Sequence, residues 1–394
     1  MRSSSWQKNL AVITIAEFLA MAGFFMVNPF TPLYLQQLGH LSSDQAAFWS
    51  GMSIGGASLA MFVSAPLWGL ISDRFGRKLM FLRSLFGGAV VVGLYTLMVN
   101  VYAFVALRIC QGLFTGIVAT AAALVVNVTP RNKVPFAMGV LMGTIYAATS
   151  VGPLMGGFLA DHFGYTTTFI VTSLLLITAG ILVLFFTRED FQAPAKADRA
   201  SLKSTLRLAA SPAMLPLLLV IVFMNMGPMI ISPIVTLRIY EINPLGDVAS
   251  AAGLAFALAG GLASLSSFFI GRLDKKMSLR NILLWSSFIT GLLYLLPMGA
   301  NTVTWMVITV GLTGLVVGGT LISSNALITY SAPAALHGVA FGLSQSSSAL
   351  GRGLGPIIGG VLVPFIGLRP VFGVAAGAFI LAALLNMLLL SRHK

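Results

Sequence analysis

The sequence predicts an all-α membrane fold of twelve transmembrane helices, arranged as two pseudo-symmetric six-helix bundles. Hydrophobic residues make up 57% of the 394 positions and charged residues only 8%, whereas a typical soluble domain carries about 25% charged residues. The apolar stretches are long enough for helices that cross a hydrocarbon core about 30 Å thick. Motifs of the first half also recur in the second half. Lipid permits only helices or closed barrels, and no alternation typical of barrel strands is visible.

The apolar stretches place the twelve helices in chain order. Six predicted spans cover residues 10–35, 46–71, 79–99, 101–128, 135–160 and 165–187. Six more cover residues 213–240, 248–271, 279–299, 302–330, 338–363 and 368–390. The first span holds Glu17 and Pro29 and is expected to be a retained helix rather than a cleaved signal peptide. We therefore expect an N-terminal bundle over residues 1–187, a cytoplasmic linker over 188–212 and a C-terminal bundle over 213–394.

The distribution of lysine and arginine predicts the orientation of these spans. With the N-terminus in the cytoplasm, nineteen of the 23 basic residues fall on the cytoplasmic side and two on the opposite side. Basic residues are retained on the cytoplasmic side of membrane proteins, so both termini are expected there. The net charge of +13 is then a topology signal that faces anionic lipid, and no nucleic-acid partner is expected.

An internal repeat supports the division into halves. The segment GLISDRFGRK begins at Gly69, and a weaker copy, GRLDKK, begins at Gly271, 202 residues later. The segment GPLMGG begins at Gly152, and GPIIGG begins at Gly355, 203 residues later. Duplicated halves are typical of transporters, in which the substrate site lies between the halves near the middle of the membrane.

Three charged residues lie deep inside predicted spans, away from the span ends, where a charge is costly and usually functional. Glu17 is the only acid deep within a span, about 10 Å from the cytoplasmic end, and suits a proton carrier or a site for a cation; the alternative is a side chain that snorkels to the interface. Arg108 lies at a different depth, so we expect it to bond helix-1 backbone near Gly23 rather than Glu17. Arg352 has no evident acidic partner and is compatible with carbonyl contacts, a wet cavity or an anion.

Aromatic and methionine side chains in the spans suit a central cavity that adapts to varied apolar ligands. The alternative for each of them is ordinary packing or contact with lipid. The candidates for lining this cavity, with one amide and one arginine, are Phe24, Asn28, Phe114, Tyr146, Phe223, Met226 and Arg352.

Two glycine-containing motifs carry backbone requirements. In the loop that follows Gly69, Gly76 allows unusual dihedral angles, and Asp73 is an acid beside Arg74 and Arg77 that suits the positive end of a neighbouring helix. In GPLMGG, Pro153 removes one helical hydrogen bond. The glycines of that motif, which allow close approach of another helix, are Gly152, Gly156 and Gly157.

These motifs resemble the major facilitator superfamily, and within it the twelve-helix drug:proton antiporters of bacteria. The resemblance covers the whole chain and includes the loop from Gly69 to Lys78, Arg108 with Gln111 and Gly112 in helix 4, GPLMGG in helix 5, and the helix-1 signature from Asn28 to Pro32. It implies proton-driven export of drug-like compounds. It also implies that Asp73 contacts helix 11 of the other half as a conformational latch, and that GPLMGG is an antiporter hinge.

One position departs from that family. Many of its members have an aspartate near the cytoplasmic end of helix 4, where this chain has Asn127. An ion pair between that acid and Arg77 is therefore not expected here.

Other functions are weaker alternatives. One is a major facilitator transporter of a sugar or another small metabolite, and another is a non-transporting membrane receptor or intramembrane enzyme. The segment from Gly51 to Gly55 fits the G-x-S-x-G pattern of hydrolases, but that pattern requires a strand–turn–helix and a partner histidine. No P-loop and no metal-ligand spacing is present. We expect no enzyme activity and no cofactor, and a monomer with a drug-like substrate, protons and lipid as its partners.

Overall fold

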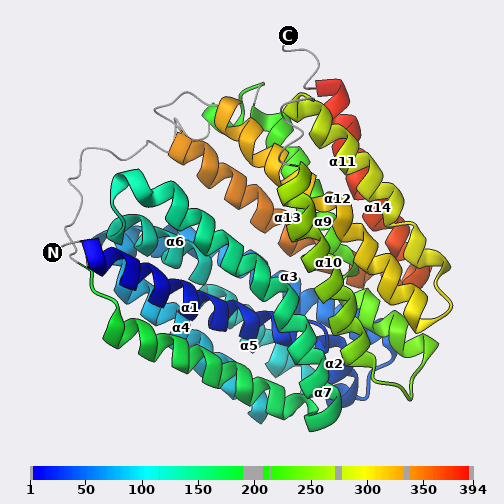
Figure 1. Ribbon diagram of the computed structural model, residues 1–394. Helices are drawn as coiled ribbons and strands as arrows, with labels where there is room; N and C mark the ends of the chain where they lie inside the picture. Colours follow the sequence, from blue (N-terminus) through cyan, green and yellow to red (C-terminus); the bar gives the residue numbers. More distant parts are fainter. Residues whose placement is uncertain are drawn as a thin grey trace.

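The computed structural model describes residues 3–114, 116–189, 207–212, 214–270, 277–331 and 337–389. The helices of the first half are α1 (Ser3–Val27), α2 (Thr31–Gly39), α3 (Ser43–Phe75), α4 (Arg77–Leu94), α5 (Val101–Phe114), α6 (Ile117–Val128) and α7 (Val134–Phe186). Those of the second half are α9 (Met214–Ile242), α10 (Val248–Ile270), α11 (Leu279–Leu293), α12 (Val303–Ser331), α13 (His337–Ile366) and α14 (Leu368–Leu389). Figure 1 shows the two groups of helices side by side.

The expected number of membrane crossings is confirmed. Eleven helical stretches in the described residues are long and apolar enough to span a membrane. One of them runs over residues 131–186 and is long enough for two crossings. It contains α7, which is interrupted at Gly164 by non-helical dihedral angles (φ 82°, ψ 165°). Counting α7 as two spans gives the twelve predicted helices.

The predicted extent of the first span is wrong at its end. We expected one helix over residues 10–35, but α1 ends at Val27, and α2 begins at Thr31 after a turn. Pro29 has no amide hydrogen and cannot continue the hydrogen-bond pattern of α1. The hydroxyl of Thr31 donates to the Val27 carbonyl at 2.8 Å, so the last carbonyl of α1 keeps a partner.

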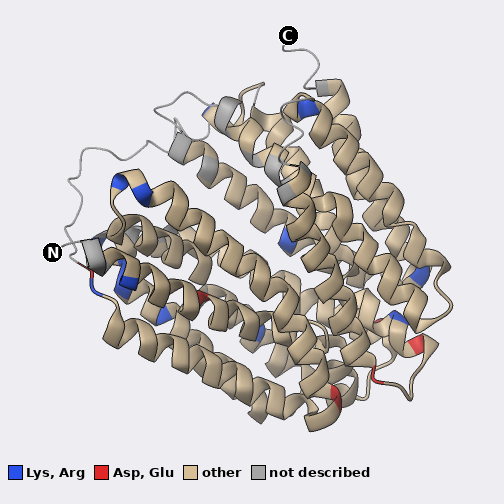
Figure 2. Cartoon of the chain, viewed as in Figure 1, with Lys and Arg blue, Asp and Glu red and all other residues tan. Residues whose placement is uncertain are grey.

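The membrane-spanning helices run between two ends of the molecule, which we call the terminus end and the far end. The terminus end carries the start of α1, the end of α14 and the turn between α6 and α7. The far end carries the turn between α4 and α5 and the loop between α9 and α10. Figure 1 shows the start of α1 at the left and the end of α14 at the top of the view. Figure 2 shows that the middle parts of the helices carry few charged residues, as expected for segments surrounded by lipid.

Candidate functional site

Glu17 is fully buried inside the first half. Its side chain is 0% exposed, and neither carboxylate oxygen has a hydrogen-bond partner among the described residues. The expectation of a deep acid in the first span therefore holds, and the snorkelling alternative does not. A buried ionised carboxylate without a partner costs several kcal/mol, which marks Glu17 as a candidate functional residue.

Arg108 connects α5 to the break between α1 and α2. Its guanidinium donates to Gln111 Oε1 at 3.1 Å and to Asn28 Oδ1 at 3.3 Å, and it reaches Thr31 Oγ1 at 3.5 Å. The hydroxyl of Tyr95 donates to the same Gln111 oxygen at 2.6 Å. This polar network is buried and joins three helical segments of the first half.

The expected partner of Arg108 was wrong in one respect. The guanidinium was expected to bond helix-1 backbone near Gly23, but its partners from that region are the side chains of Asn28 and Thr31. The Gly23 carbonyl instead accepts from the hydroxyl of Thr172 at 3.2 Å. Glu17 takes no part in these hydrogen bonds, as its different depth predicted. Tyr95 was not predicted as a member of this network, because only the folded structure brings it beside Gln111.

The loop between α3 and α4 turns at Gly76. This residue has φ 96° and ψ 156°, a region that is accessible essentially to glycine alone. Arg74 is exposed and its guanidinium lies 5.3 Å from the centre of the Phe75 ring. The contacts of Gly69 and of the Asp73 side chain lie outside the described part of the structure, so they stay predictions.

An acid that the sequence did not single out holds the start of α4. Glu189, just past the end of α7, accepts from the backbone N–H of Arg77 at 3.1 Å and of Lys78 at 2.8 Å. A carboxylate stabilises a helix N-terminus because it satisfies free N–H groups and the helix dipole. The side-chain amide of Asn127 donates to the same carboxylate at 2.9 Å. Glu189 thus supplies a negative charge beside Asn127, where many relatives were expected to have an aspartate.

Replacing Glu189 by alanine is expected to loosen the start of α4. The amides of Arg77 and Lys78 would lose their acceptor, and hydrogen bonds to charged groups are worth about 1.5–3 kcal/mol. Deuterium uptake of a peptide covering residues 77–80 should accelerate by roughly tenfold or more. Glu241→Ala removes an exposed acid at the far end and is the matched control. Unchanged uptake in the Glu189 variant would show that these contacts do not stabilise the helix.

The GPLMGG motif lies on α7 with faces toward two different helices. A Cβ atom added to Gly152 would lie 2.7 Å from Phe25 Cβ, and one added to Gly156 would lie 2.5 Å from Met26 Cα. Both contacts are with α1 of the same half. A Cβ atom added to Gly157 would instead lie 2.7 Å from the carbonyl carbon of Ala249 on α10. The motif therefore joins α7 to its own bundle and to the other half.

The copy of this motif on α13 makes equivalent contacts. Gly355 and Gly359 pack against α9 of the same half, and Gly360 packs against Ala47 and Phe48 on α3 of the first half. Carbon atoms in ordinary contact are about 3.5–4.0 Å apart, so no side chain fits at these positions. The repeat found in the sequence is therefore also a repeat of contacts.

The glycines packed against the two motifs, on α3 and α10, also occupy equivalent positions in the two halves. A Cβ atom on Gly51 of α3 would lie 3.0 Å from the carbonyl carbon of Pro356, and one on Gly253 of α10 would lie 3.0 Å from that of Pro153. We call these residues the far-end seal. Its members are Gly51, Pro153, Gly157, Gly253, Pro356 and Gly360. A buried hydrogen bond of 2.6 Å from the Thr236 hydroxyl to the Pro29 carbonyl also joins the two halves.

The cavity candidates differ in their burial and in their partners. Phe24 and Met226 are partly buried against the core, as is Phe223, and Asn28 belongs to the Arg108 network. Phe114 is 42% exposed and Tyr146 is 39% exposed. Arg352 is partly buried, and its Nε has no partner among the described residues.

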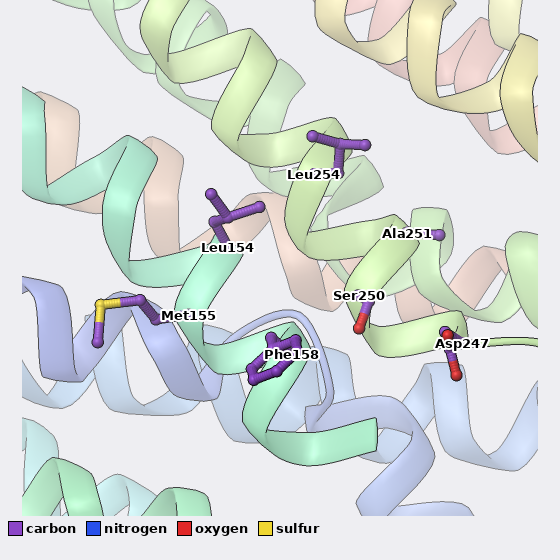
Figure 3. Close-up of a pocket in the computed structure, with 7 residues that line it drawn as sticks. All are labelled: Leu154, Met155, Phe158, Asp247, Ser250, Ala251 and Leu254. Carbon is purple, nitrogen blue, oxygen red and sulfur yellow. The ribbon is translucent and has the colours of Figure 1, made fainter. Parts of the chain in front are cut away.

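A groove of about 520 Å³ lies between the halves close to the seal. Three of its lining residues lie on α7, three lie on α10, and Asp247 directly precedes α10; Figure 3 shows their side chains. They are Leu154, Met155, Phe158, Asp247, Ser250, Ala251 and Leu254. None of the cavity candidates lines this groove.

Two repeated bundles of membrane-spanning helices, packed on each other through paired glycine motifs, define a polytopic membrane protein with the architecture of a transporter. The family model of the Major Facilitator Superfamily matches residues 13–263 and 217–394. The chain therefore belongs to the Major Facilitator Superfamily.

Curated relatives match over nearly their whole length. Multidrug resistance protein MdtG of Citrobacter koseri is 33% identical over 393 residues, which cover 99% of this chain and 97% of the relative. The protein of the same name from Klebsiella pneumoniae (strain 342) is 33% identical over 391 residues, with 98% and 95% covered.

Solved structures share the fold at low sequence identity. A bacterial homologue of the human lysosomal transporter Spinster, in an inward-facing and occupied conformation, matches with a TM-score of 0.82 and 15% identity, covering 98% of this chain and 96% of that one. The human organic anion transporter MFSD10 matches with a TM-score of 0.71 and 16% identity, covering 97% and 99%.

Proposed function

We propose that this protein exports drug-like, amphipathic compounds across the bacterial inner membrane by proton-driven alternating access. The multidrug resistance proteins that it resembles over nearly their whole length support this substrate class. The low share of charged residues, 8%, also favours apolar substrates over sugars, because specific polar ligands require more buried polar partners.

We place the terminus end in the cytoplasm, on the basis of the asymmetric distribution of lysine and arginine. The far end then faces the periplasm, and the far-end seal closes the path to it. Support comes from the tight glycine contacts between the halves and from the likeness to an inward-facing homologue. In this assignment the protein takes up substrate from the cytoplasm or the inner leaflet in the present conformation.

Glu17 is the residue that we propose as the proton carrier. The observation behind this assignment is a carboxyl group that is 0% exposed and unpartnered among the described residues. A buried acid that releases its proton must regain water or a cation, because an isolated charge in the bilayer is costly. Glu17 therefore requires a second conformation in which it is accessible, and this requirement couples protonation to the exchange between conformations.

The remaining site residues take supporting roles in this proposal. Arg108 fixes α5 to the break after α1 through Asn28 and Thr31, so movement at this break reaches the helix that contains Glu17. The proposed substrate cavity lies between the halves. Phe24, Phe223 and Met226 would provide its apolar walls, and Arg352 its one positive charge. The protein acts as a monomer and requires no cofactor.

The test is efflux from cells that overproduce the protein. A panel of amphipathic dyes and antibiotics is loaded into energised cells, and loss of each compound is followed before and after a protonophore collapses the proton gradient. We expect faster efflux than in cells with an empty vector, and loss of this difference with the protonophore. An unchanged advantage after collapse would exclude proton drive. Export of sugars without effect on any panel compound would favour the alternative substrate class.

A further inference from the structure

Asp161 joins the two halves at the far end. It lies on α7, one turn beyond the GPLMGG motif, and its carboxylate accepts from two backbone N–H groups of α10. The Oδ1 atom accepts from Ala249 at 3.2 Å, and Oδ2 accepts from Ser250 at 2.7 Å. These N–H groups lie in the first turn of α10, where a helix has free donors and a positive dipole. The carboxylate of one half thus caps a helix of the other half.

The chain segment around Asp161 repeats the loop between α3 and α4. Asp73-Arg74-Phe75-Gly76 and Asp161-His162-Phe163-Gly164 share the pattern D-x-F-G. The two glycines also share an uncommon backbone conformation, with φ 96° and ψ 156° at Gly76 and φ 82° and ψ 165° at Gly164. The first loop lies at the terminus end and the second at the far end.

This relation is what an inverted repeat within one bundle produces. Three-helix units with opposite orientation place equivalent loops at opposite ends of the membrane. The loop at the terminus end carries Asp73, whose expected partner is the first turn of α13 in the other half. By the same relation, Asp161 and α10 form the counterpart of that contact at the far end.

The second half does not repeat this arrangement. Gly367 has φ 78° and corresponds to Gly164 in the repeat of halves, but Pro364 stands where Asp161 would be expected. The helix that α13 contacts, α3, is capped within its own half. The hydroxyl of Ser42 accepts from the Gln45 amide in a capping box. Of the two equivalent helices α3 and α10, it is therefore α10 whose N-terminus is capped by a residue of the other half, and that residue is Asp161.

We propose that Asp161 is a latch that stabilises the conformation with the far end closed. This inference rests on the proposed alternating access. When the far end opens, α7 and α10 separate, and the first turn of α10 loses its carboxylate partner. Glu189 also caps a helix, but within one half, so its contacts are not broken by movement between the halves. Asp161 is a positioning residue, and it changes the balance between conformations without contacting substrate.

Distances between spin labels at the two ends test this latch directly. For the far end, cysteines replace Val99 and Leu245. These two residues lie on different halves and are 82% and 98% exposed. A second pair replaces Arg131 and Asn281, exposed residues of different halves at the terminus end. The native Cys110 is exposed and is changed to serine in every sample.

Asp161→Asn removes the charge and one of the two acceptor oxygens. We expect the population with a closed far end to fall about tenfold relative to the open one, as for the loss of a charged hydrogen bond. The far-end distance should lengthen and the terminus-end distance should shorten. Asp161→Glu, which keeps the carboxylate, should restore part of the closed population. The matched control is Asp44→Asn, which neutralises an exposed acid in the first turn of α3.

A second variant removes the opposite partner of the bond. Ser250→Pro deletes one N–H donor, and proline is tolerated in the first turn of a helix. It should shift both distances in the same direction as Asp161→Asn. Unchanged distance distributions in both variants would overturn the latch. The measurement needs no transported substrate, so failure to export drugs would contradict the proposed function and leave this test intact.

Discussion

Replacing Glu17 by glutamine is expected to abolish proton-driven export while the protein stays folded. Glutamine is neutral and nearly the same size as a protonated glutamate, and Glu17 is fully buried without a partner among the described residues. The variant should therefore mimic one protonation state permanently. Drug efflux from energised cells should fall to the level of cells with an empty vector, whereas the thermal unfolding midpoint of the purified protein should stay within a few degrees of the parent.

Glu241→Gln is the control for this change. Glu241 is an exposed acid that accepts from the buried Arg238 at 2.9 Å; glutamine keeps an oxygen that can accept this hydrogen bond, and Arg238 also donates to the Ala300 carbonyl at 3.0 Å. This variant should export drugs at the parental rate. Full activity of Glu17→Gln would remove Glu17 from the proposed mechanism, because no proton could then pass through this side chain.

Replacing Gly157 by alanine is expected to prevent closure of the far end. The added Cβ atom would lie 2.7 Å from the Ala249 carbonyl carbon of the other half. This contact is with helix backbone, which cannot move aside as a flexible side chain could. The two halves would have to move apart, so the open far end becomes the favoured conformation. Spin-label distances between residues 99 and 245 should lengthen, and export should fall by roughly tenfold or more for a penalty of 1–3 kcal/mol.

Other glycines of α7 separate this effect from simple overpacking. Gly156→Ala places a Cβ atom against Met26 of the same half, so it should lower the thermal unfolding midpoint without a preference for one end. Gly139 and Gly143 have open space around the Cβ position, and their alanine variants should resemble the parent. Equal far-end distances in Gly157→Ala and the parent would show that this contact does not limit closure.

The helices were predictable because lipid leaves few alternatives. Apolar stretches in a membrane must form helices, and the structure has the number expected. The break after Val27 was not predicted, because Pro29 is compatible with either a kink or a complete interruption of the helix. That choice depends on Thr31 and on the contact of the Pro29 carbonyl with Thr236, which lies 207 residues away in the chain.

The candidate site was predictable in its residue types and less so in its partners. Burial of Glu17 follows from its position within an apolar stretch, and the contacts of Gly157 and Gly360 follow from the repeated motif. Glu189 and Asp161 were missed because each is an ordinary acid near the end of a helix. Their roles arise from helix N-termini that are 111 and 89 positions away in the chain, and local sequence carries no signal for such proximity.

Proton movement in reconstituted vesicles tests proton coupling most directly. The purified protein is placed in liposomes that contain a pH-sensitive dye, and an outward-directed gradient of an exported compound is imposed with the membrane potential clamped. We predict proton flow opposite to the compound in the parent protein and none in Glu17→Gln. Transport of the compound by the parent without any proton flow would contradict the account.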